Sequence, residues 1–239
     1  SSEVSNYIHE VVSERGGHYS SPLGAVDLTI ALHYVYNTPK DKLIWDVGHQ
    51  AYAHKIITGR KNEFKNIRQH GGISGFLKID ESEYDSFGAG HASTSISAGL
   101  GYAHSRDKDK KNHQIVSIIG DGAMTGGLAY EGLNNLGFHK TQMTVVLNDN
   151  SYSISESVGA LSKYLTRIVT NPTYNKLRKD LWNLTDKIPT ISNPIKKIIK
   201  KTEGSLKAYL TPGILFEELG LNYIGPIDGH DIENMIKVF

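Results

Sequence analysis

The fold is decided by the stretch QIVSIIGDGAMTGGLAYEGLNNLGFHKTQMTVVLNDN, which runs from Gln114 to Asn150. Gln114–Ile119 and Met143–Leu147 are short, rich in β-branched residues and apolar on both faces, which predicts two buried parallel strands. A helix is expected between them, from about Gly126 to Asn135. A strand, a helix and a strand of these lengths form a βαβ unit with a right-handed crossover. We therefore predict an α/β fold with a mostly parallel sheet and helices on both faces.

Polar residues follow both predicted strands. Asp121, between two glycines, comes directly after the first strand, and the segment 148–150 follows the second. Ligands of open parallel sheets bind at the carboxyl ends of strands, so both groups should lie on one rim, about 5 Å apart. Carboxylate and amide oxygens suit Mg²⁺, and the glycine turn before a helix suits a phosphate. The pattern predicts Mg²⁺ bridged to a diphosphate.

A structural alternative exists for the same residues, in which Asp121 only caps the next helix in a turn at a strand end. The spacing to Asn150, 150 − 121 = 29 positions across a second strand, favours the metal site. A Walker loop would need a lysine after its glycines, and a Rossmann fingerprint would need GxGxxG; neither follows the first strand.

Three of the 11 histidines share one local setting. His18, His49 and His91 each follow a glycine and each stand near the start of a predicted helix. A histidine placed there can donate to a phosphate or transfer protons near neutral pH. Each one alone favours a structural role, whereas three together favour one shared anion site. His54, by contrast, is expected on a helix surface, and His139 is expected to be solvated in a polar connection.

Four further elements are expected before the βαβ unit. They are a helix over 21–36, a strand over 43–47, a helix over 50–58 and a helix over 92–104. The last is rich in Ser, Ala and Gly, so it can pack closely. Residues 152–207 are predicted to be a mobile, mostly helical insertion within a single domain over 1–239. Its lysines at 196–201 fit a solvated helix face better than a nucleic-acid site, because no aromatic residues interleave them.

Composition excludes several classes of protein. The 239 residues carry a formal net charge of +1, which gives no global field for nucleic acid or acidic lipid. The absence of cysteine excludes disulfides and thiolate metal sites. No run of 18 apolar residues is present, and residues 1–12 lack a secretory signal. We expect no membrane or nucleic-acid partner and a cytoplasmic location, or the plastid stroma in a plastid-bearing organism.

Several segments together resemble the 1-deoxy-D-xylulose-5-phosphate synthase family of transketolase-like enzymes. They are ERGGHY (14–19), HYVYNTP (33–39), DVGHQAY (46–52), ESEYD (81–85), GHASTS (90–95), the GDG…NDN pair, TPG (211–213), FEELG (216–220) and GPIDGHD (225–231). The resemblance covers nearly the whole chain apart from about 164–200. It implies a thiamine diphosphate-binding fold, with thiamine diphosphate and Mg²⁺ as cofactors.

The resemblance also implies a ligand set for the metal and the diphosphate. Asp121 and Asn150 would bind Mg²⁺, together with the backbone carbonyl of Tyr152. Gly122 and Ala123 would hold the diphosphate through their backbone N–H groups, and Asn150 would contact the cofactor as well.

Other residues would line the cofactor and the substrate. The resemblance places His49 and the Gly90-His91-Ala92 turn against the cofactor, with His18 and His49 as catalytic residues and His18 facing the substrate. The family usually has serine where this chain has Ala92. A hydroxyl contact to the cofactor is therefore expected to be absent here, while a backbone contact would remain.

The implied reaction joins pyruvate to D-glyceraldehyde 3-phosphate with release of CO₂, through an enamine on thiamine diphosphate. In this family a pyrimidine-binding domain and a C-terminal domain follow, so we expect the chain alone to be inactive and to need that domain or a second chain. The family also implies a homodimer. Two alternatives remain open: another transketolase-type enzyme, and a non-catalytic cofactor-binding or regulatory module.

Overall fold

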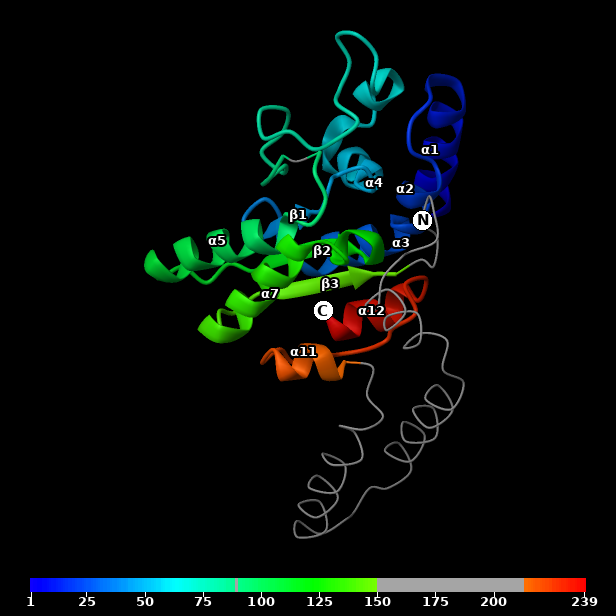
Figure 1. Ribbon diagram of the computed structural model, residues 1–239. Coiled ribbons are helices and arrows are strands. Elements are labelled where there is room, and N and C mark those ends of the chain that lie inside the picture. Colours follow the sequence, from blue (N-terminus) through cyan, green and yellow to red (C-terminus); the bar gives the residue numbers. More distant parts are fainter. Residues whose placement is uncertain (89, 150–212) are drawn as a thin grey trace. The chain divides into compact units, whose positions relative to one another are not determined.

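The computed structural model describes residues 1–88, 90–149 and 213–239 (Figure 1). The chain divides into two units, one formed by 1–155 with 227–239 and the other by 156–226. The predicted insertion over 152–207 lies almost wholly in the second unit and outside the described residues. Within the described ranges, no helix is long and apolar enough to cross a membrane.

A parallel sheet forms the centre of the first unit. Its strands are β1 (Lys42–Trp45), β2 (Ile115–Gly120) and β3 (Thr144–Asn148), in the spatial order β1-β2-β3. Both pairings are parallel, with Trp45 beside Ile118 and Gly120 beside Asn148. The predicted strands and their parallel pairing are therefore confirmed, with each strand end within one or two residues of its predicted position. The expectation that the last strand is buried was wrong, because every residue of β3 is only partly buried.

One face of the sheet packs against α3 (Val26–Val35) and α12 (Ile232–Val238). Alternate strand residues point to this face, among them Trp45 and Ile118, and both side chains are buried. Met235 brings α12 into the same core. These contacts follow from the two-residue period of a strand, which sends successive side chains to opposite faces.

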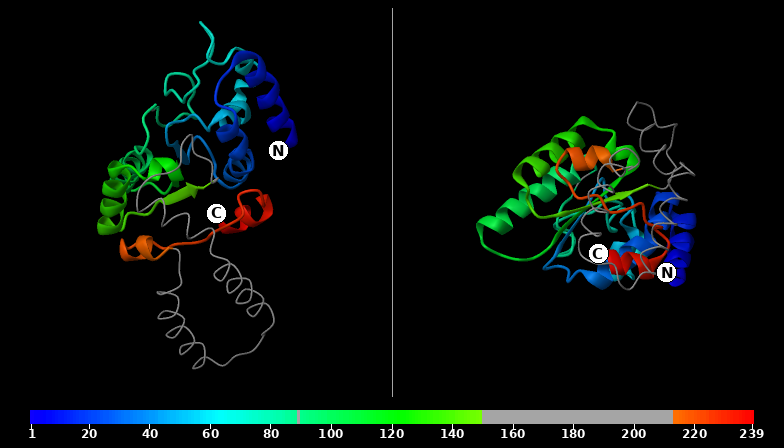
Figure 2. Two further views of the ribbon diagram at one scale, coloured as in Figure 1. Left: turned by 45° about the vertical axis from the view of Figure 1, so that its right-hand side comes forward. Right: turned by 90° about the horizontal axis from the view of Figure 1, so that it is seen from below.

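The other face packs against α5 (Ser95–Lys108), which in turn packs against α7 (Gly127–His139). The two helices lie side by side in both views of Figure 2. The intervening residues of β2 point this way: Ile115 contacts the α5 core, and the Ser117 hydroxyl donates to the Ser95 carbonyl at 2.9 Å. Helices on both faces of a parallel sheet confirm the predicted fold class.

A third cluster lies beside the sheet and is built by α1 (Ser2–Arg15), α4 (Tyr52–Lys55) with its continuation η1 (Ile56–Arg60), and η2 (Glu63–Asn66). Buried apolar side chains join these elements, among them Ile8, Val12, Tyr52 and Phe64. The expected helix over 50–58 corresponds to α4 and η1, and Gly59 has a φ of +97° near its end.

Two expectations about helices need correction. The single helix expected over 21–36 is two helices, α2 (Ser20–Gly24) and α3. Ala25 separates them with φ −106° and ψ 3°, because its N–H donates to the Pro22 carbonyl in a tight turn. In addition, a short helix α6 (Asp121–Met124) directly follows β2, where only a turn was expected.

The described part of the second unit contains α11 (Ile214–Glu218). Phe216 of this helix stacks on Tyr223, with ring centroids 5.8 Å apart and planes within 6°. Gly213 leaves room for the same tyrosine, because a Cβ there would come within 2.2 Å of its ring. This packing gives the FEELG segment a structural role within its own unit.

Candidate functional site

Polar residues from all three strands meet at one edge of the sheet. Asp46 follows β1, Asp121 follows β2, and Asn148 ends β3 with Asp149 next to it. The parallel register pairs Gly120 with Asn148, so the ends of β2 and β3 are direct neighbours. The expectation that both groups share one rim is confirmed for every member that the structure describes.

Asp121 is the first residue of α6 and is partly buried. Burial and the nearby Asp149 carboxylate raise the pKa of Asp121, while the backbone N–H groups of Gly122 and of Asp121 itself act in the opposite direction. Two carboxylates at one strand edge repel each other, and a bound cation would relieve that repulsion. The donor set therefore fits a hard divalent cation.

Space is available in front of the glycine turn. Gly122 is exposed, and a Cβ added to it would meet no other atom within 4 Å. Ala123 is partly buried, and both residues lie in the first turn of α6. Backbone N–H groups in this position can face an anion without a side chain in the way.

His18 and His49 lie against each other, although they are distant in the sequence. Their ring centroids are 5.1 Å apart, and the Phe76 ring contacts His18 at 6.0 Å. Among the described residues, neither Nδ1 atom has a hydrogen-bond partner, although both are buried. Two unpaired ring nitrogens in one place are available to bind a ligand.

Burial lowers the pKa of both histidines. For His18 the positive charge of Arg68 adds to this effect on the pKa. For His49, proximity to His18 also lowers the pKa, while the Asp46 carboxylate opposes the change. Both rings are therefore neutral at pH 7, so each can accept a proton as well as donate one.

Glycines allow the close approach of these two histidines. Gly48 has φ +88°, and a Cβ on it would lie 3.0 Å from the Leu77 amide nitrogen. Gly17 has φ +139°, and a Cβ there would lie 2.9 Å from the Tyr52 hydroxyl. That hydroxyl accepts a hydrogen bond from the His18 N–H at 3.3 Å. A side chain larger than that of glycine would therefore collide with its neighbours at the position before each histidine.

The turn that contains His91 is fastened by Asp46, a residue that the sequence analysis did not identify as functional. The buried Asp46 carboxylate accepts hydrogen bonds from the backbone N–H groups of Ser93 at 2.8 Å and Ser95 at 3.0 Å. The Ser93 hydroxyl donates to the Ala123 carbonyl at 2.7 Å. These bonds join the end of β1, the His91 turn and the α6 turn into one framework.

The outer part of this turn faces solvent. Gly90, His91 and Ala92 are all exposed. Since the Ala92 side chain is exposed, a serine hydroxyl there would have been free to contact a ligand. A signal for Asp46 was present in the sequence, because an acidic residue within the expected strand over 43–47 has to be paired or used.

Two predicted metal ligands, Asn150 and Tyr152, lie outside the described residues. Within the described ranges, no group of three or more His, Asp or Glu residues is arranged to hold a metal ion. Asn148, which ends β3, places its side-chain amide nitrogen 3.5 Å from the Gln50 side-chain oxygen. The complete ligand set for the metal therefore stays a prediction.

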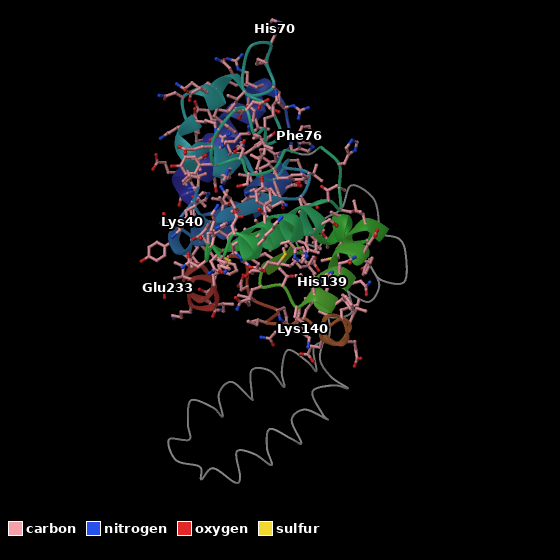
Figure 3. The ribbon with its side chains drawn as sticks, turned by 90° about the vertical axis from the view of Figure 1, so that its left-hand side faces the viewer. Lys40, His70, Phe76, His139, Lys140 and Glu233 are labelled. Carbon is pink, nitrogen blue, oxygen red and sulfur yellow. The ribbon has the colours of Figure 1, made fainter. Side chains whose placement is uncertain are left out.

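The predictions for other histidines had mixed outcomes. His54, expected on a helix surface, is wholly buried, with Nε2 3.3 Å from the Asp85 carboxylate. That expectation was wrong because His54 is buried against Asp85, which is 31 positions away (85 − 54 = 31), and the local sequence does not reveal so distant a contact. His139 stands at the exposed end of α7, as Figure 3 shows, in agreement with its expected solvation.

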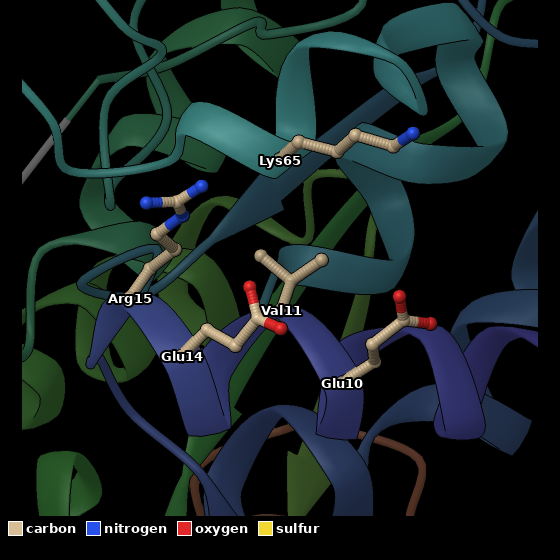
Figure 4. A pocket seen from close by; sticks show the side chains of 5 residues that line it. All are labelled: Glu10, Val11, Glu14, Arg15 and Lys65. Carbon is tan, nitrogen blue, oxygen red and sulfur yellow. The ribbon is translucent and has the colours of Figure 1, made fainter.

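A small open pocket lies elsewhere, between α1 and η2 (Figure 4). It is lined by Glu10, Val11, Glu14, Arg15 and Lys65. None of the predicted site residues lines it. The candidate site is therefore defined by the strand ends and not by this pocket.

Comparisons with known proteins show which proteins the chain is similar to. A family model described as 1-deoxy-D-xylulose-5-phosphate synthase matches residues 1–239. A 1-deoxy-D-xylulose-5-phosphate synthase of Carboxydothermus hydrogenoformans is 56% identical over 237 residues, which are 99% of this chain and 38% of that protein. One from Syntrophus aciditrophicus is 53% identical over 236 residues, 99% of this chain and 36% of the relative. The chain thus spans less than two fifths of the length of these relatives.

Solved structures show the same fold. A transketolase crystal structure from Pichia stipitis superposes with a TM-score of 0.67 at 15% sequence identity, covering 98% of this chain and 32% of that one. A second transketolase structure from the same organism gives the same TM-score at 16% identity. At such low identity the likeness concerns the fold alone.

Proposed function

Since the chain belongs to the 1-deoxy-D-xylulose-5-phosphate synthase family, we propose that it supplies the thiamine diphosphate and Mg²⁺ site of such an enzyme. The reaction would join pyruvate to D-glyceraldehyde 3-phosphate and release CO₂. The observation that carries the proposal is the shared sheet edge, where Asp121, the His91 turn and the His18–His49 pair are tied to the ends of three parallel strands.

The metal would be held at the ends of β2 and β3. Asp121 would supply a carboxylate oxygen, and Asn150 and the Tyr152 carbonyl would complete the protein ligands. The raised pKa of Asp121 supports this assignment, because a carboxyl group disfavoured by burial and by Asp149 gains most from a cation. The backbone N–H groups of Gly122 and Ala123 would bind the diphosphate.

The cofactor's reactive end would be lined by His49 and the Gly90-His91-Ala92 turn. Bound there, thiamine diphosphate supplies an electron sink for the loss of CO₂ from a 2-oxo acid. The chain's own contribution is positioning and proton transfer. His18, neutral and next to His49, would accept a proton from, or donate one to, an oxygen of the substrate.

A chimera tests the proposal. Residues 1–239 would replace the matched 237 residues of the Carboxydothermus relative, with which they are 56% identical. We expect CO₂ release from pyruvate that depends on D-glyceraldehyde 3-phosphate, thiamine diphosphate and Mg²⁺. Asp121→Ala should abolish it, while Asp80→Ala, at an exposed position, should not. A folded chimera that is inactive would contradict the proposal, and one that prefers pentose phosphates would point to a transketolase.

A further inference from the structure

A short segment, residues 74–78, forms a wall beside the histidine pair. Phe76, which Figure 3 labels, places its ring edge against the His18 ring at 6.0 Å. Leu77 is buried in the core, and its amide nitrogen approaches Gly48, directly before His49. A displacement of this segment would therefore change the surroundings of both histidines.

Two carboxylates fasten the ends of this segment. The Ser74 N–H donates to Glu81 Oε2 at 2.8 Å, and the Lys78 N–H donates to Asp85 Oδ2 at 3.1 Å. Glu81 and Asp85 are the first and last residues of ESEYD, a segment singled out in the sequence and left without a role by the proposed cofactor site.

Residues of α4 and η1 bind the same two carboxylates. Arg60 binds Asp85 with two nitrogens, at 2.7 and 2.8 Å, and reaches Glu81 at 3.0 Å. Lys55 pairs with Glu81 as well. The side chains of Lys55 and Asp85 are fully buried, and those of Arg60 and Glu81 nearly so.

Histidines extend this cluster without adding charge. His54 Nε2 lies 3.3 Å from Asp85 Oδ1, and His54 Nδ1 forms a hydrogen bond with His33 Nε2 at 2.9 Å. Burial lowers the pKa of both His33 and His54, so both rings are neutral at pH 7. Two cations therefore balance two carboxylates, and the neutral histidines pack against this cluster without changing its charge.

A buried ion cluster of this kind is a poor source of stability, since the loss of hydration offsets most of the attraction. What it provides is a fixed geometry. The helix that carries Lys55 begins at Tyr52, whose hydroxyl accepts the His18 N–H. One helix thus holds His18 directly and holds the Phe76 segment through the ion cluster.

We propose that Arg60, Glu81 and Asp85 are positioning residues that set Phe76 against His18. The inference rests on the proposed function only for the part that His18 plays in the reaction. The geometry itself is a property of the chain without cofactor, so it is tested without cofactor.

The test measures the titration of His18 by NMR in the full chain, with ¹³C-labelled histidine and a His18→Gln variant to assign the signal. Burial is the first cause of the lowered pKa of His18, ahead of Arg68, which is left unchanged. Phe76→Leu should therefore raise the pKa of His18 toward its ordinary value, because water gains access to the ring.

Glu81→Gln keeps the size of the side chain but removes its charge. We expect it to shift the His18 titration upward in the same direction, and to add nothing further when combined with Phe76→Leu. Glu83→Gln is the matched control, because Glu83 is an exposed carboxylate of the same ESEYD segment, and it should leave the titration unchanged. If Glu81→Gln lowers the unfolding midpoint but leaves the His18 titration where it was, the cluster is structural only and the proposal is overturned.

A milder variant decides the matter if Glu81→Gln does not fold. Arg60→Lys keeps the positive charge but cannot bind Asp85 with two nitrogens and Glu81 at the same time. An upward shift of the His18 titration is expected. No shift in this variant, with a clear shift in Phe76→Leu, would overturn the proposal. Neither result depends on whether thiamine diphosphate binds.

Discussion

The packing of α5 on the sheet can be tested by adding one methyl group at Gly99. A Cβ there would lie 2.3 Å from the Ser117 hydroxyl oxygen and 2.7 Å from Met143 Cε. The methionine end can move aside, but Ser117 cannot, because it belongs to β2 and its hydroxyl donates to the Ser95 carbonyl. Gly99→Ala should therefore force α5 away from the strands.

The magnitude combines three contributions. Overpacking costs about 1–3 kcal/mol, and the lost buried hydrogen bond costs about 1 kcal/mol more. Replacing glycine by alanine inside a helix returns about 1 kcal/mol. The net expectation for Gly99→Ala is destabilisation by about 1–3 kcal/mol, whereas Gly101→Ala should stabilise by about 0.5–1 kcal/mol. Gly101 is exposed in the same helix, and a Cβ there would meet nothing within 4 Å.

Urea unfolding followed by circular dichroism gives the free energy of unfolding for both variants. We expect the free energy of unfolding to be lowest for Gly99→Ala, intermediate for the wild type and highest for Gly101→Ala. If Gly99→Ala were as stable as Gly101→Ala, α5 could not lie against Ser117 as described, and the arrangement of the sheet edge would be wrong with it.

Two further predictions concern buried polar groups. Burial beside His54 lowers the pKa of His33 to about 4, below its ordinary 6.5, so the unfolded chain binds this proton more readily. The free energy of unfolding should therefore be greatest above pH 6.5 and fall as the pH drops from 6.5 to about 4. His33→Gln should make this decline smaller, as measured by urea midpoints at a series of pH values. A pH profile that is the same in His33→Gln and in the wild type would contradict the burial argument. Asp46→Asn leaves a single acceptor oxygen for the N–H groups of Ser93 and Ser95, so we expect a loss of about 1–3 kcal/mol and weaker binding of thiamine diphosphate by calorimetry. Unchanged stability and affinity in Asp46→Asn would show that the His91 turn is fixed by other contacts.

Much of the fold could be predicted because its signals are local. Strands buried on both faces must be apolar throughout, and this property identified Ile115–Gly120 as a parallel strand. The same composition identified Thr144–Asn148, although that strand is only partly buried. The shared edge followed from topology alone. The break at Ala25 was missed because the helical spacing of Leu23, Val26 and Ile30 continues across the turn.

Other features depend on contacts between distant segments, which a single sequence does not reveal. His54 has helical periodicity around it, and only the approach of Asp85 explains why it is buried. Asp46 and Ser93 are 47 positions apart and meet only because the turn before α5 lies against the end of β1. Asn150 was indicated by its spacing from Asp121 and Tyr152 by the resemblance to a family; both lie outside the described residues and stay predictions.

Calorimetric titration of thiamine diphosphate into the chain tests the central claim most directly. The titration would be run with Mg²⁺ and with EDTA, on the wild type, on Asp121→Ala and on the exposed control Asp80→Ala. The account predicts binding that requires Mg²⁺, disappears in Asp121→Ala and persists in Asp80→Ala. Binding that is indifferent to Mg²⁺, or that survives in Asp121→Ala, would contradict a metal-bridged diphosphate site at the ends of β2 and β3.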